Sequence, residues 1–120
     1  MKGVLVDPYL KTIENVEVGD WTDIKKHLQC DIFGSGGYDE GGDAIYVNDE
    51  GLYTETMFWY APEIYPYPYA GRVLFLGINR ANGESQDAWL DAEDVQDYDA
   101  KFMTREEVEG MYSQWSQYYG

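Results

Sequence analysis

The sequence predicts an α+β fold in which an antiparallel sheet of four to six strands packs with two helices, a short one near residues 20–28 and a C-terminal one near 104–118. Short apolar runs that alternate or stop at glycine and proline predict the strands. Apolar residues at helical spacing predict the helices. Because 44% of the 120 residues are hydrophobic and 17% are aromatic, we expect one folded acidic domain over residues 1–120.

The first part of the chain predicts two strands followed by a helix. Residues 4–6 form a short apolar run that ends before a proline, and residues 12–18 alternate with period two. A glycine then breaks the second strand. Asp20 is placed to cap a helix that ends near Leu28. The apolar face of this helix consists of Trp21, Ile24 and Leu28.

The next segment predicts a loop and a hairpin. Residues 34–42 include five glycines, which are typical of a mobile loop. Residues 44–47 and 52–56 flank the sequence Asn48-Asp49-Glu50-Gly51, which favours a hairpin turn, so both flanking runs are expected to be strands. Residues 57–60 either extend the second of these strands or begin a turn.

The last third of the chain predicts two strands and a helix. Residues 72–78 are the most hydrophobic run and the best candidate for a central strand, and residues 95–102 predict a last strand with Tyr98 and Phe102 facing inward. Thr104 and Glu107 form a capping box that begins the C-terminal helix. The apolar stripe of this helix is Val108, Met111, Tyr112, Trp115 and Tyr119.

No group of residues indicates catalysis, so we expect that the protein is not an enzyme. His27 and Cys30 have no third residue nearby that would orient them for nucleophilic catalysis, and two such residues do not make a zinc site. The glycines of residues 34–37 lack the lysine and hydroxyl residue of a phosphate-binding loop. The acids of residues 91–99 do not have calcium-loop spacing, so we expect no metal and no cofactor.

The charge distribution points to a basic partner. The 23 acids and 8 bases give a net charge of −15, which argues against direct binding to nucleic acid or to anionic membranes. Residues 31–71 contain eight acids and no Lys or Arg, and residues 84–109 contain ten acids and two bases. Solubility, or an organism whose proteins are acidic in general, is the alternative explanation.

A protein that grips nucleic acid would present the matching positive surface. Carboxylates spaced like backbone phosphates would occupy the same groove of such a partner, and electrostatic attraction would steer the association. The residues expected to form this acidic partner-binding surface are Glu84, Asp87, Asp91, Glu93, Asp94, Asp97, Asp99, Glu106, Glu107 and Glu109.

A Tyr- and Pro-rich segment is the second candidate for partner binding. Three prolines exclude residues 61–69 from a helix interior or a central strand and favour an extended backbone. Rigid tyrosine and tryptophan side chains are typical anchors of protein interfaces. The candidate anchors are Trp59, Tyr60, Tyr65, Tyr67 and Tyr69. Phe58 and Trp59 are also expected in the core, whereas Tyr65, Tyr67 and Tyr69 are expected to be exposed. Exposed rings would also allow two copies of the chain to form a homodimer.

The sequence also favours a cytoplasmic location. It has no apolar run near the roughly 20 residues that cross a bilayer, a single cysteine, and an N-terminus unlike a signal peptide. A phage-encoded protein of this kind would act in the cytoplasm of its host.

Several motifs give the chain a family resemblance. Val4-Leu5-Val6-Asp7-Pro8, then Ile45-Tyr46-Val47-Asn48-Asp49-Glu50-Gly51, then Gly71-Arg72-Val73-Leu74-Phe75-Leu76-Gly77 look like a family of short domains of unknown function in phage and plasmid genomes. The likeness spans about residues 3–103, and the Tyr-Pro segment and the acidic C-terminal helix depart from it. The resemblance implies no catalytic residues. It implies a mobile-element setting, where small acidic proteins resemble inhibitors of host machinery.

The leading hypothesis is therefore a non-enzymatic, phage-type inhibitor of a host restriction, CRISPR, repair or transcription protein, in which the acidic surface mimics nucleic acid. The alternative is an adaptor or regulatory module that docks through the Tyr-Pro segment, with the charge serving solubility.

Overall fold

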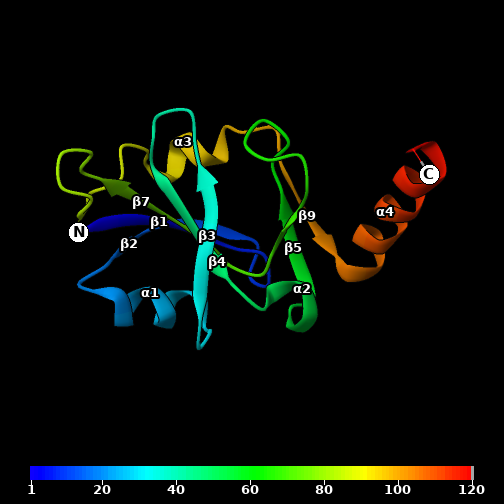
Figure 1. The fold of residues 1–120 in the computed structure, drawn as a ribbon, viewed down its shortest axis with the longest axis horizontal. Helices are drawn as coiled ribbons and strands as arrows, with labels where there is room; N and C mark the ends of the chain where they lie inside the picture. The colour runs from blue at the N-terminus through cyan, green and yellow to red at the C-terminus, as the bar shows by residue number, and fades with distance from the viewer. Residues whose placement is uncertain (120) are drawn as a thin grey trace.

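The computed structural model describes the backbone of residues 1–119 and the side chains of residues 1–113. It confirms the predicted α+β fold (Figure 1). The described residues form a six-stranded antiparallel sheet, a three-stranded antiparallel sheet and four helices, two of which have at least seven residues. In the described part of the chain, no helix is both long and apolar enough to cross a membrane.

The six-stranded sheet is built around the most hydrophobic run of the sequence. Its strand order is β2 (Thr12–Glu17), β1 (Lys2–Asp7), β7 (Val73–Ile78), β4 (Ala44–Asn48) and β3 (Phe33–Tyr38), and β8 (Ser85–Gln86) pairs with the end of β7. The first five residues of β7 are buried, because β1 and β4 flank the strand and side chains pack on both faces of the sheet. The predicted central strand and the predicted strands corresponding to β1, β2 and β4 are therefore confirmed.

Helix α1 (Trp21–Leu28) covers one face of this sheet, as predicted. The Asp20 carboxylate accepts a hydrogen bond from the Thr22 amide at 3.0 Å and so caps the helix. Ile24 and Leu28 are buried against β7, whereas Trp21 is exposed and lies under the Lys25 ammonium group. The prediction of an apolar face is thus confirmed for two of its three residues.

The cap of α1 gives a testable stability difference. Asp20→Ala removes the acceptor for the Thr22 amide, so the free energy of unfolding should fall by about 1 kcal/mol. Asp20→Asn keeps a side-chain oxygen at the cap and should lose only a small part of that. Urea unfolding of the two variants beside the parent measures both values, and equal stabilities of all three proteins would contradict the cap's role.

The predicted loop of residues 34–42 is wrong in its first half, where the chain forms strand β3. Gly34 to Gly37 pair with β4, with a register shift between Ser35 and Gly37. A Cβ at Gly36 would lie 3.0 Å from Ile45 Cγ2 and 3.0 Å from Tyr69 Cε1. Glycine therefore occurs here because a neighbouring segment packs closely on the strand, which is a cause that no local pattern displays.

The predicted hairpin after β4 is also wrong. Residues Gly51–Thr54 form the short helix α2, and the next strand, β5 (Met57–Tyr60), belongs to the second sheet. This sheet has the order β6 (Tyr69–Ala70), β5, β9 (Lys101–Thr104). The turn after β4 continues as a helix because the Thr54 and Glu55 amides donate to the Glu50 and Gly51 carbonyls.

The predicted last strand over residues 95–102 is only partly correct. Its first two residues end helix α3 (Ala92–Gln96), residues 97–100 form a turn, and only its last two residues belong to β9, which pairs with β5. Val95 is buried as part of α3, and Tyr98 and Phe102 are half-buried against the same core. Short apolar spacings fit a helix turn as well as a strand, so the pattern could not separate the two.

One aromatic side chain joins the two sheets. Trp59 of β5 is 1% exposed, and its ring lies 6.0 Å from Phe75 of β7 in an edge-on arrangement. Its other neighbour is Tyr69, which stacks at 6.3 Å. The core of the six-stranded sheet therefore continues into the three-stranded sheet. Helix α3 packs against the edge of this shared core (Figure 1).

Helix α4 (Arg105–Tyr119) begins at the predicted capping box. The Glu107 carboxylate accepts from the Thr104 amide at 3.1 Å, and the Glu107 amide donates to the Thr104 hydroxyl at 3.2 Å. Val108 is buried on β5 and β9, with Met111 and Tyr112 half-buried beside it. The side chains of Trp115 and Tyr119, the rest of the predicted stripe, lie outside the described residues.

Candidate functional site

The Tyr-Pro segment divides into buried and exposed rings. Trp59 and Phe58 lie in the core as expected, so Trp59 is not available as a partner anchor. The expectation that Tyr69 is exposed is wrong, since it is 5% exposed and its hydroxyl donates to the Gly36 carbonyl at 2.7 Å. Burial also raises the pKa of Tyr69. Tyr60 is half-buried and packs against the core under α4.

Two of the predicted anchors remain at the surface. Tyr65 is 42% exposed and Tyr67 is 46% exposed, and their rings meet edge-on at 5.7 Å. The inner face of Tyr65 stacks on Tyr69 at 5.3 Å, and Tyr67 lies 6.2 Å from Tyr112 of α4. The buried tyrosine thus holds the exposed pair in place, which limits the entropy that these rings would lose on binding.

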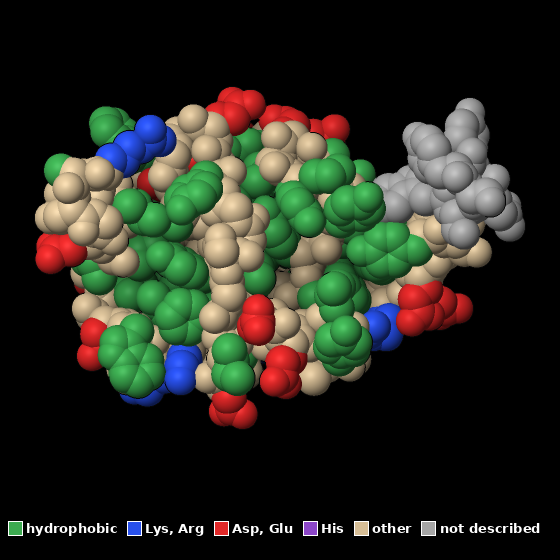
Figure 2. Space-filling model, in the orientation of Figure 1, with side chains coloured by type: hydrophobic (Ala, Val, Ile, Leu, Met, Phe, Trp, Pro, Cys, Tyr) green, Lys and Arg blue, Asp and Glu red, His purple; other side chains and the backbone are tan. Residues whose placement is uncertain are grey.

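A groove of about 440 Å³ lies between strand β3 and this segment. We call it the β3 groove, and it is lined by residues 35–38, 47–49, 52, 64, 65 and 68–70. The glycines of β3 leave its wall without side chains, while Val47, Ile64 and Tyr65 supply apolar surface. Figure 2 shows hydrophobic side chains gathered in the middle of this face of the molecule, with carboxylates around its edge and in its lower part.

All ten acids of the predicted acidic surface are exposed. Four of them also have structural roles. The Asp91 carboxylate bonds to the Lys2 ammonium group, Asp87 accepts from the Lys2 amide, Asp94 accepts from the Asp91 amide at the start of α3, and Glu107 caps α4. Within the described side chains, Asp91 is the only one of the ten in an ion pair.

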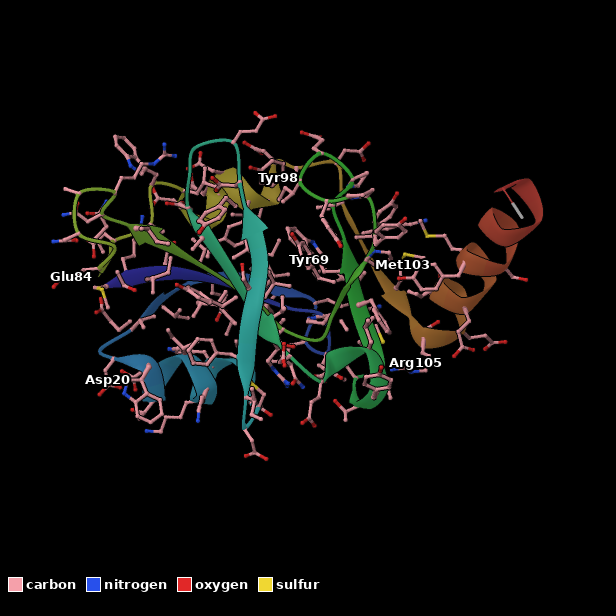
Figure 3. The ribbon with its side chains drawn as sticks, in the orientation of Figure 1. Asp20, Tyr69, Glu84, Tyr98, Met103 and Arg105 are labelled. Atoms are coloured by element: carbon pink, nitrogen blue, oxygen red, sulfur yellow. The ribbon has the colours of Figure 1, made fainter. Side chains whose placement is uncertain are left out.

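The structure does not bring the ten acids into one row. Glu84 lies at one end of the molecule, while α4 with its three glutamates begins beside Arg105 toward the other end (Figure 3). Between them, α3 and the turn after it carry Glu93, Asp94, Asp97 and Asp99. The acids of α3 and of α4 are therefore separate groups, and α3 is the more central of the two.

Acids that the sequence does not place near α3 join it in the fold. The Asp99 amide donates to the Glu63 carboxylate at 3.3 Å. Burial raises the pKa of the Tyr98 hydroxyl, and the negative charges of Asp39, Glu40, Glu63 and Asp43 raise it further. The β3–β4 turn and the turn after β5 lie on the same side of the molecule as α3 (Figure 1). We call the exposed acids Glu40, Glu63, Glu93, Asp94, Asp97 and Asp99 the α3 acidic face. Sequence separation hid Glu40 and Glu63, because the β3–β4 turn and the turn after β5 carry them here.

Asp43 is the buried centre of this region. It is fully buried, and its two carboxylate oxygens accept from the Trp89 amide at 3.0 Å and the Leu90 amide at 3.1 Å. The Asp43 amide in turn donates to Asp39 at 2.9 Å. Asp43 thus ties the β3–β4 turn to the residues that lead into α3, and so positions the acidic face.

Asp39 has one carboxylate oxygen, Oδ2, that is buried without a hydrogen-bond partner among the described residues. Burial raises the pKa of Asp39 above its ordinary value of 3.8, and the nearby Asp43 carboxylate raises it further. The folded state therefore holds this proton more tightly than the unfolded state, so the contribution of Asp39 to stability is largest below pH 3.8 and decreases as the pH rises.

The variant Asp39→Asn tests this sign. Asparagine keeps one oxygen for the Asp43 amide and carries no charge at any pH. We expect the variant to be more stable than the parent near pH 7. This advantage should disappear at about pH 3.5, which lies within the pH range in which an aspartate titrates. Urea unfolding of both proteins across this range measures the difference. A difference that stays constant with pH would contradict the assignment.

His27 and Cys30, the residues considered for catalysis or metal binding, lie apart from the two surfaces described above. The His27 ring nitrogen Nε2 lies 2.8 Å from the Glu17 carbonyl oxygen. Cys30 is half-buried, and burial raises the pKa of its thiol, which lowers the fraction of reactive thiolate. In the described part of the chain, no three His, Cys, Asp or Glu side chains come together in a way that could hold a metal ion.

Comparisons of the chain with protein-family models, with curated protein sequences and with solved structures gave no match. The likeness to short phage and plasmid domains therefore stays an expectation that depends on the chain's own motifs. The inference of function therefore depends on two surfaces, the α3 acidic face and the β3 groove.

Proposed function

We propose that the protein is a non-enzymatic inhibitor that binds a host defence or nucleic-acid-handling protein through the α3 acidic face. The observation that carries this proposal is that the acids of this face have no cationic partner among the described residues. In the described part of the chain, none of the six carboxylates of this face is in an ion pair. They remain available to the positive groove of a partner, where they would take the place of phosphates.

The energetics support a function for these charges. Like charges held close together on a small fold repel one another and reduce its stability. A cationic partner removes that repulsion when it binds, and the field of a protein with net charge −15 accelerates the encounter. The mobile-element setting and the host cytoplasm are part of the same proposal, since the targets of such an inhibitor act there.

Charge reversal at the centre of the face tests the proposal. Asp97 and Asp99 are exposed, and within the described residues neither side chain accepts a hydrogen bond. Asp97→Lys with Asp99→Lys changes the net charge from −15 to −11, because each reversal adds two. We expect this variant to bind the partner at least about tenfold more weakly. The tagged protein would be used to capture partners from a bacterial lysate at about 50 mM and about 300 mM salt, with identification by mass spectrometry.

A matched control has the same change in charge elsewhere. Glu17→Lys with Asp31→Lys also gives −11, but Glu17 ends strand β2 and Asp31 follows helix α1 in the chain, so neither belongs to the α3 acidic face. The expected result is capture of a nucleic-acid-binding protein at low salt by the parent and the control, but not by the α3 variant. The purified partner should then lose its bound DNA or RNA when the parent protein is added. Equal capture by both variants, or capture that persists at high salt, would overturn the mimicry.

The alternative, an adaptor that docks through the Tyr-Pro segment, is favoured by the exposure of Tyr65 and Tyr67. In that case Tyr65→Ala with Tyr67→Ala should abolish capture while reversal of Asp97 and Asp99 has little effect. The same lysate experiment therefore separates the two functions.

A further inference from the structure

The two edges of the six-stranded sheet are protected to different degrees. At the β2 edge, the Ile13 carbonyl accepts from the Gln96 side chain at 3.0 Å, and the strand carries Glu14 and Glu17. Strand β3 has the sequence FGSGGY, without a charge or a proline. Charges, prolines, bulges and covering elements are the usual means by which proteins prevent strand addition. Within the described part of the chain, β3 has its bulge and the packing of Tyr69 on Gly36.

The ladder shows which backbone groups of β3 point outward. The Ile32 carbonyl accepts from the Asp49 amide, and the Asp39 amide donates to the Asp43 carbonyl, so residues 32 and 39 face β4. Backbone groups alternate in direction along an antiparallel strand, and the bulge shifts the alternation by one residue. The amides and carbonyls of Phe33, Ser35 and Tyr38 therefore point away from β4, at the open edge.

The β3 groove lies beside this edge. Gly34 and Gly36 are on the face of the sheet that carries Val47 and Tyr69, as the atoms around a Cβ built at Gly36 show. An incoming strand could place an apolar side chain in the β3 groove, between Val47 and Tyr65. Edge hydrogen bonds with a pocket for alternate side chains are the two components of recognition by strand addition.

The charge around the edge selects the partner. Asp31 precedes β3, Asp39 and Glu40 follow it, and Asp49 lines the groove, while residues 31–71 contain no Lys or Arg. A second copy of this chain would bring the same acids against these, so pairing of two copies is disfavoured. We propose that β3 is a docking edge for an extended basic segment of a partner protein, which adds as a strand and inserts an apolar side chain into the β3 groove.

This proposal goes beyond nucleic-acid mimicry, because it needs neither the acids of α3 nor a phosphate-binding partner. Its probe is a short peptide of alternating lysine and valine, added to the isotope-labelled protein at up to about 1 mM, a range that detects weak binding. Amide hydrogen exchange measured by NMR is the readout. The expected result is slower exchange at Phe33, Ser35 and Tyr38 together with shifts in the Val47 methyl signals.

Three matched comparisons separate strand addition from simple charge attraction. A peptide with the same sequence and N-methylated backbone cannot form edge hydrogen bonds and should give no protection. A lysine–glycine peptide leaves the groove empty and should bind more weakly. Asp49→Lys should weaken the lysine–valine peptide about fivefold or more at low salt, whereas Asp97→Lys with Asp99→Lys should leave its protection pattern unchanged.

Each outcome has a defined meaning. No protection at the three edge amides, or equal binding of the N-methylated peptide, overturns the docking edge and leaves the α3 acidic face untouched. Protection that disappears with the α3 reversal also overturns it, because the peptide would then be held by α3. Self-association of the protein without peptide, seen as edge protection that rises with protein concentration, would assign the edge to a second copy instead.

Discussion

Replacing Trp59 with alanine is expected to lower the free energy of unfolding by about 3 to 5 kcal/mol. The side chain is 1% exposed and contacts Phe75 of one sheet and Tyr69 of the other. Its removal leaves a cavity where the sheets meet, and it withdraws the ring on which Tyr69 stacks. Since Tyr69 supports Tyr65, the β3 groove should also lose its shape.

Trp89→Ala is the matched control, because this tryptophan is 77% exposed. Its loss should change the free energy of unfolding by about 0.5 kcal/mol or less. Guanidinium unfolding followed by far-UV circular dichroism measures both variants. If Trp89→Ala is as damaging as Trp59→Ala, the packing between the sheets is not as described. The result also guards the binding experiments, since lost binding in a Trp59 variant would report loss of the fold.

Asp43→Ala is expected to destabilise the protein by about 2 to 4 kcal/mol, which is the second large effect. The substitution leaves the part-buried Trp89 and Leu90 amides without their carboxylate acceptor. It also frees the β3–β4 turn from the residues that enter α3. Asp43→Asn keeps one acceptor oxygen and should fall between the alanine variant and the parent.

Asp49→Ala serves as the control for a lost carboxylate, because Asp49 is exposed. It should be within about 0.5 kcal/mol of the parent in urea unfolding. Hydrogen exchange gives a more specific readout, since the amides of Trp89 and Leu90 should exchange faster in Asp43→Ala before global unfolding. Slow exchange at both amides in the alanine variant would contradict the role of Asp43.

Together these residues couple the stability of the fold to its two candidate surfaces. Asp43 positions the α3 acidic face, and Trp59 with Tyr69 supports the β3 groove. Binding studies therefore need surface variants, such as Asp97 and Asp99 for the first surface and Asp49 for the second, whose substitution leaves the core in place.

The sequence by itself predicts the parts of the fold that depend on local signals. The apolar runs of β1, β4 and β7, the alternation in β2, the Asp20 cap and the capping box of Thr104 and Glu107 are all confirmed, because each depends on neighbours within a few residues. The exposure of the acids in residues 84–109 also follows from their chemistry, since ionised carboxylates stay in water unless they are paired.

Tertiary structure decides the remainder, because its causes are distant in the chain. The glycines of β3 read as a loop until Tyr69, more than thirty residues away, is seen packed upon them. Tyr69 looks like an exposed anchor until the fold encloses it. Glu40 and Glu63 join the acids of α3 only because the fold brings their two turns to the same side of the molecule as α3. A periodic pattern describes the faces of one element, whereas burial and the gathering of charges depend on which elements meet.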